Sequence, residues 1–139
     1  VNIRNFKNRK KGMAITAIAG PVSNLIMGFI SIVFLNLVAA FWVSASSSLP
    51  DVIYWFLYFN AFININLAVF NLLPIPPLDG SRLAAVIIPD KYYYKLMQYE
   101  KYIMIVVLLL LFTGLLTGPL VFLSTSIFNG MNWLVGLIF

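Results

Sequence analysis

One carboxylate stands out in this apolar chain because of where the sequence places it. Asp79 directly follows an apolar run long enough to cross a membrane, in the segment Asn71-Leu-Leu-Pro74-Ile-Pro76-Pro77-Leu78-Asp79-Gly80. A charge is costly inside a bilayer, so an ionisable side chain at such a place is a functional-site candidate by default. A carboxylate held there can ligate a metal ion or act in an aspartate pair.

Asp79 lacks the partners that would complete a catalytic site within this chain. The sequence contains no histidine and no cysteine, which excludes a histidine-ligated zinc, a thiolate site or a serine-histidine triad made from these residues alone. Of the other acids, Asp51 is predicted on the opposite side of the membrane, and Asp90 and Glu100 fall in a basic interfacial stretch. Neither an oxygen-only metal cage nor a two-aspartate protease fits that distribution. The chain taken alone is therefore predicted to be catalytically inert.

Asp79 also has a purely structural interpretation. It can lie in an interfacial loop, pair with Arg82, or cap a helix that begins near Gly80 and Ser81. The whole segment favours a functional site instead. A helix that carries amide side chains is followed by three prolines and then by the acid, and this order holds one carboxylate where the helix ends. An extended, stiff hook is expected over residues 74–78. Non-helical backbone at membrane depth must be buried in protein or line a watery cavity, so the hook points to an internal site.

The composition predicts a membrane protein. Hydrophobic residues make up 62% of the 139 residues and charged residues only 9%, so one soluble core cannot hide the apolar surface. The lysines and arginines fall in two blocks, residues 4–11 and 82–101, that flank apolar runs. The net charge of +5 therefore indicates how the chain is oriented in the membrane, with the basic residues beside anionic lipid headgroups. Nucleic-acid binding is disfavoured.

The apolar runs predict an all-α, polytopic transmembrane helix bundle with about three spans and a C-terminal apolar segment. The spans are residues 13–43, 52–73 and about 102–123, the last interrupted near Gly114 and Gly118-Pro119. The chain then divides into a basic cytoplasmic segment (1–12), a transmembrane core with Leu78-Asp79-Gly80 (13–123), and an interfacial, re-entrant or partial span (124–139).

The positive-inside rule gives this bundle an orientation. The connection at residues 44–51 has no lysine or arginine, which places it on the non-cytoplasmic side. Residues 1–11 and Asp79 then face the cytoplasm. We therefore expect an integral, multi-pass protein of the cell membrane.

Two helix faces are expected to be buried. A stripe of small or amide residues on the first span lets another helix approach closely, with Asn24 able to hydrogen-bond across it; its members are Ala17, Gly20, Asn24, Gly28 and Ser31. On the second span, Asn60, Asn64 and Asn71 share a face while Asn66 points elsewhere. Because amides are costly against lipid, this face should line the bundle interior.

These motifs together resemble the second half of a site-2 protease, one of the intramembrane zinc metalloproteases of peptidase family M50. The resemblance covers about residues 12–83 and rests on Ala-Gly-Pro-x-x-Asn at 19–24 followed by Asn-x-x-Pro-x-Pro-x-Leu-Asp-Gly at 71–80. In that family a His-Glu-x-x-His motif on an earlier helix supplies two zinc ligands and the glutamate base. The resemblance implies that Asp79 is the third ligand of one zinc ion. It assigns further residues to shaping the cleft, namely Asn24, Asn71, Pro74, Pro76, Leu78 and Gly80.

The histidine motif is missing from this chain, and Val1 is not an initiator methionine, so we expect a fragment whose upstream half carries the histidines. The implied reaction is hydrolysis of peptide bonds in or near transmembrane segments. The implied partners are a membrane-protein substrate, the lipid bilayer and the missing N-terminal half.

Two other classes stay open. One is a non-catalytic structural or regulatory membrane module, in which Asp79 is only a helix cap or an ion-pair partner. The other is a transporter fragment, suggested by a broken helix and by polar residues within the spans.

Overall fold

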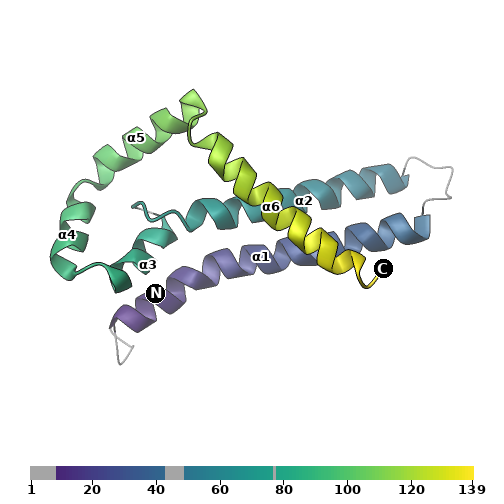
Figure 1. The fold of residues 1–139 in the computed structure, drawn as a ribbon, viewed down its shortest axis with the longest axis horizontal. Coiled ribbons are helices and arrows are strands. Elements are labelled where there is room, and N and C mark those ends of the chain that lie inside the picture. The colour runs from purple at the N-terminus through teal and green to yellow at the C-terminus, as the bar shows by residue number, and fades with distance from the viewer. Residues whose placement is uncertain (1–8, 43–48, 77) are drawn as a thin grey trace.

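The computed structural model describes residues 9–42, 49–76 and 78–139, and every regular element in these ranges is an α-helix (Figure 1). The helices are α1 (Arg9–Trp42), α2 (Leu49–Asn71), α3 (Asp79–Ile87), α4 (Asp90–Gln98), α5 (Glu100–Thr113) and α6 (Thr117–Gly136). The all-α prediction is confirmed. The expectations for residues 1–8, for most of the polar connection at 44–51 and for Pro77 lie outside the described residues.

Helices α1 and α2 form a long antiparallel pair (Figure 1). Within them, Lys11–Phe41 and Asp51–Asn71 are long and apolar enough to cross a membrane. A third span is possible by the same criteria if α4 and α5, which meet at a bend of 68°, count as one broken span. Pro21 lies inside α1 and does not end it. These spans agree with the predicted bundle.

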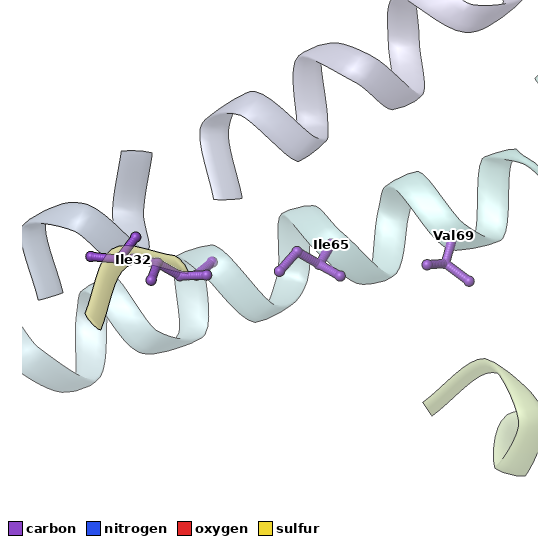
Figure 2. Packing of buried hydrophobic residues seen from close by; sticks show 5 residues of the cluster. Ile32, Ile65 and Val69 are labelled. Carbon is purple, nitrogen blue, oxygen red and sulfur yellow. The ribbon is translucent and has the colours of Figure 1, made fainter. Parts of the chain in front are cut away.

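Small residues let α1 and α2 pack closely. A Cβ atom added to Gly28 would lie 3.0 Å from Cγ1 of Ile65 and 3.3 Å from the carbonyl oxygen of Ala61. Ile32 of α1 is fully buried and belongs to the same cluster of buried residues as Ile65 and Val69 of α2 (Figure 2). The buried face predicted for α1 is confirmed at its stripe members Ala17, Gly28 and Ser31.

Side-chain amides add two hydrogen bonds between helices. Nδ2 of Asn60 on α2 donates to Oγ of Ser31 on α1 at 2.6 Å, and Nδ2 of Asn36 on α1 donates to Oδ1 of Asn132 on α6 at 2.9 Å. Asn64 instead donates back along its own helix, to the carbonyl of Asn60 at 2.8 Å. We predicted that the asparagine face of α2 lines the bundle interior, and this is confirmed at Asn60, which contacts α1 directly.

The C-terminal half turns back over the long pair. Gly114 ends α5 in the left-handed region, with φ of 80°, and α6 then crosses α2 and α1 (Figure 1). The helix bounds therefore differ from the span predicted at 102–123. The interruption at Gly114 is a reversal between two helices, whereas Pro119 lies in the first turn of α6, where proline is tolerated. Helix α6 runs unbroken through residue 124.

Helix α3 packs against α1 at the end of the pair where α2 finishes. Its residues Gly80, Ser81 and Ala85 are buried, whereas no residue of α4 is buried. This contact between α3 and α1 positions the beginning of α3, where Asp79 lies.

Candidate functional site

The segment between α2 and α3, residues 72–78, is called the hook below. Its backbone forms successive turns: the amide of Ile75 donates to the carbonyl of Leu73 at 2.8 Å, and the amide of Leu78 donates to the carbonyl of Ile75 at 2.9 Å. The extended hook expected from the prolines is wrong. Proline presets the φ angle of the second position of a tight turn as readily as that of an extended strand, and Pro76 occupies that position in the turn from Ile75 to Leu78. Pro76 is also fully buried.

Gly80 lets the start of α3 lie close to the first residues of the hook. A Cβ atom at this position would collide with the backbone carbonyl oxygens of Leu72 and Leu73. Both carbonyls belong to the first two residues of the hook, directly after the last residue of α2. The start of α3, and with it Asp79, is therefore held directly against the start of the hook, next to the end of α2.

The carboxylate of Asp79 lies against α1 at Gly20. A Cβ atom built on Gly20 would be 2.9 Å from Oδ2 of Asp79, closer than Cβ atoms normally approach any atom. Asp79 is half-buried there. The carboxylate thus occupies space that any other residue at position 20 would fill, and the fold brings together the two motifs that the sequence keeps far apart.

The structural interpretation of Asp79 does not match this geometry. Asp79 is the first residue of α3, the N-cap is Leu78, and no side chain caps the helix. Among the described residues, neither Arg82 nor any other group forms a hydrogen bond or an ion pair with the Asp79 carboxylate. What remains is the favourable position of an acid in a first helical turn, worth about 0.3–1 kcal/mol.

The other residues predicted to shape the site take different positions. Asn71 is the last residue of α2 and is half-buried, and Asn24 is half-buried one turn beyond Gly20 on α1. Pro74 is exposed in the hook. The structure thus joins Asp79, Gly80 and the end of α2 at one point, while Pro74 lies at the surface.

Helix α5 covers the hook from another side, a contact that sequence reasoning missed. Pro76 and Leu78 line a small apolar cavity together with Met104 and Val107 of α5. The spacing of apolar residues in α5 did not indicate this partner, because the helix is apolar on all sides. Ser81 was missed as well: its hydroxyl donates to the carbonyl of Leu78 at 2.7 Å and reinforces the start of α3.

The donor set fits one ligand position of a metal site and not a whole site. In the part of the chain that the structure describes, no group of three or more His, Cys, Asp or Glu side chains could hold a metal ion. Asp51 lies in the first turn of α2, roughly 30 Å along that helix from its other end. Asp90 and Glu100 begin α4 and α5. Asp79 alone presents a carboxylate, a regular zinc donor, at the close contact with Gly20.

Comparison with known proteins gives consistent matches. A family model described as Peptidase family M50 matches residues 38–114, a range that includes Asp79. The chain is 38% identical over 115 residues to the "Putative zinc metalloprotease YwhC" of Bacillus subtilis (strain 168), over 83% of this chain and 52% of that protein. It is 39% identical over 67 residues to the "Putative zinc metalloprotease MJ0611" of Methanocaldococcus jannaschii, over 48% of this chain and 30% of that protein.

The chain spans about half the length of the Bacillus relative and less of the Methanocaldococcus relative. No solved structure matches the chain. The range that the family model matches carries the motif that ends at Gly80.

Proposed function

The chain belongs to peptidase family M50, and from this membership we propose that it forms the part of a membrane zinc metalloprotease that supplies Asp79 as the third protein ligand of the zinc ion. The observation that carries the proposal is the carboxylate itself. It is half-buried against Gly20 at the junction of α1, α2 and α3, and no described residue caps or neutralises it.

The separate roles of the zinc ion, of Asp79 and of the upstream residues follow from which donor side chains this chain contains. A zinc ion bound there would supply Lewis-acid activation of water and of a peptide carbonyl. Asp79 contributes a negative charge and a fixed position, and it must be ionised to do so. The two histidine ligands and the glutamate base are assigned to a His-Glu-x-x-His motif in an upstream part of the same protein, because this chain contains no histidine. Asp79 is therefore a ligand and not the general base.

The proposed substrates are peptide bonds in or near the transmembrane segments of membrane proteins. Two membrane-length helices flank the site, so a substrate helix can reach it from within the bilayer. The amides of Ile75 and Leu78 already donate within the hook, which leaves them unable to pair with a substrate strand. We assign substrate contact to the half-buried side chain of Asn71. The hook residues Pro74, Pro76 and Leu78, together with Gly80 and Asn24, are assigned to shaping the cleft.

The orientation of the protein in the membrane is also a proposal. Arg82, Lys91 and Lys95 lie on α3 and α4, at the same end of the long pair as Lys11 (Figure 1). The positive-inside rule places that end, and Asp79 with it, on the cytoplasmic side of the cell membrane. The division into 1–12, 13–123 and 124–139 stays a prediction, and α6 crosses its second boundary. Lipid and the upstream half of the protein are the proposed neighbours of α1 and α2.

Cleavage by the full-length protein tests this function. The protein is reconstituted into vesicles with a reporter transmembrane substrate, and Asp79→Asn is compared with Asp51→Asn, which changes an exposed acid at the far end of α2. We expect Asp79→Asn to lower zinc-dependent cleavage by at least the roughly 10–100-fold that is typical for groups that only orient a ligand, because here the charge of the ligand itself is lost. Asp51→Asn should cleave like the wild type. Equal cleavage by both variants would contradict the proposal and favour the non-catalytic module.

A further inference from the structure

We propose that Gly20 is a positioning residue for Asp79, because the missing side chain at position 20 fixes where the carboxylate lies. The inference rests on the proposed role of Asp79 as a metal ligand. Its starting observation is the 2.9 Å separation between a Cβ atom built on Gly20 and Oδ2 of Asp79. Neither composition nor helical spacing predicts this contact, because the two residues belong to different helices.

The backbones on both sides of the contact are held by packing. On α1, Ala17 and Pro21 next to Gly20 are fully buried. On α3, Gly80 fits against the backbone of Leu72 and Leu73 without room for a side chain, and Ser81 is 2% exposed. A methyl group added at position 20 therefore cannot be accommodated by separating the helices at low cost. The end of the Asp79 side chain is the flexible partner, so it is the carboxylate that moves.

Gly28 provides a matched comparison on the same helix. A Cβ atom there would meet Cγ1 of Ile65 at 3.0 Å, nearly as close as the contact at Gly20. Gly28 lies roughly 12 Å from Gly20 along α1. The atoms closest to a Cβ built on Gly28 are apolar side-chain atoms or backbone atoms. Gly28→Ala thus makes the same chemical change in a similarly tight place without touching the carboxylate.

The expected consequence is a loss of metal affinity without a loss of folding. Metal ligands function within narrow limits of distance, and disturbing the groups that orient them typically costs about 10–100-fold in affinity. Alanine is also a better helix former than glycine, which opposes any destabilisation of α1 by the added methyl. Lower affinity with preserved thermal stability separates positioning from a general structural role.

The experiment measures metal binding by the full-length protein in detergent micelles. Zinc affinity is obtained by competition with a chelator, and the absorption spectrum of the cobalt(II)-loaded protein reports the ligand geometry. The variants are Gly20→Ala, Gly28→Ala, Asp79→Ala and the double variant of Gly20 and Asp79. We expect Gly20→Ala to weaken zinc binding about 10–100-fold and to change the cobalt spectrum. Gly28→Ala should leave both unchanged, and Gly20→Ala should add no further loss once Asp79 is alanine.

The outcomes separate the positioning role from the ligand role. If Gly20→Ala binds metal like Gly28→Ala while Asp79→Ala loses it, the positioning role is overturned and the ligand role stands. A Gly20→Ala effect that persists at full size in the Asp79→Ala background also overturns the positioning role, because Gly20 would then act independently of the carboxylate. Wild-type zinc affinity in Asp79→Ala overturns the ligand role itself.

Discussion

Gly80 lies so close to the carbonyl oxygen of Leu73 that no side chain fits between them. This contact holds the start of α3 against the start of the hook, so that α3 begins where α1 passes. Because the neighbouring atoms are backbone and not the end of a side chain, a rotamer change cannot relieve a clash here. The position of Asp79 therefore depends on a glycine that itself offers no chemistry.

Replacing Gly80 by alanine should destabilise the protein and detach Asp79 from its place. Overpacking against rigid backbone costs about 1–3 kcal/mol or more, so we expect a lower free energy of unfolding together with weaker zinc binding. Unfolding in mixed detergent micelles and zinc content measure the two effects. Gly130→Ala is the control, since a Cβ atom there meets nothing within 4 Å. Equal stability of the two variants would contradict the close packing.

The hydrogen bond from Asn60 to Ser31 should contribute measurably to the pairing of α1 and α2. Interhelical side-chain bonds in membrane proteins average about 0.6 kcal/mol and reach about 1.7 kcal/mol. A double-mutant cycle of Asn60→Ala and Ser31→Ala, read from unfolding in micelles, should give a coupling in this range. Asn66→Ala is the control, because the hydrogen bond that the Asn66 side chain donates among the described residues runs to the carbonyl of Phe62 on its own helix. Strictly additive effects of the pair would show that the bond is not formed.

Ser124 should be a position where alanine stabilises the protein. Its hydroxyl is fully buried and has no hydrogen-bond partner among the described residues. An unsatisfied buried polar group costs about 1–3 kcal/mol, which alanine removes at nearly the same volume. We expect Ser124→Ala to raise the thermal midpoint. Ser126→Ala removes an exposed hydroxyl that donates to the carbonyl of Phe122 and should not raise it; a lower midpoint for Ser124→Ala would refute the prediction.

Gly114 should be sensitive to alanine although nothing crowds it. A Cβ atom there meets nothing within 4 Å, but its φ of 80° is unfavourable for other residues and costs about 1–2 kcal/mol. Gly114→Ala should therefore lower the free energy of unfolding by that amount. The comparison is Gly118→Ala, which is equally open but lies in α6. Indistinguishable unfolding of the two would mean that the reversal between α5 and α6 does not require a left-handed residue.

The sequence predicted the features that depend on composition and on local pattern. The all-helical bundle follows from the apolar runs, and the placement of Asp79 beyond a helix end follows from Pro74 and Pro76, which cannot continue α2. The turns within the hook could not be predicted, because proline fits turns and extended strands alike. The reversal at Gly114 was also missed, since a glycine between two apolar helices can interrupt a single span or separate two.

The contact between Gly20 and Asp79 illustrates why the site was only partly predictable. Both residues were recognised within their motifs, Gly20 in a small-residue stripe and Asp79 as an isolated acid. Helical spacing says which residues share a face of one helix, but it does not say which residue of another helix will lie against that face. The close approach depends on the combined path of α2, the hook and α3.

The zinc content of the purified full-length protein tests the role of Asp79 most directly. Wild type and Asp51→Ala should retain the same amount of zinc, whereas Asp79→Ala should lose most of it while remaining folded and inserted in the membrane. Such a loss is expected because Asp79 would be the only protein ligand that this chain contributes. An Asp79→Ala protein that retains the wild-type zinc content would contradict the assignment of Asp79 as a zinc ligand.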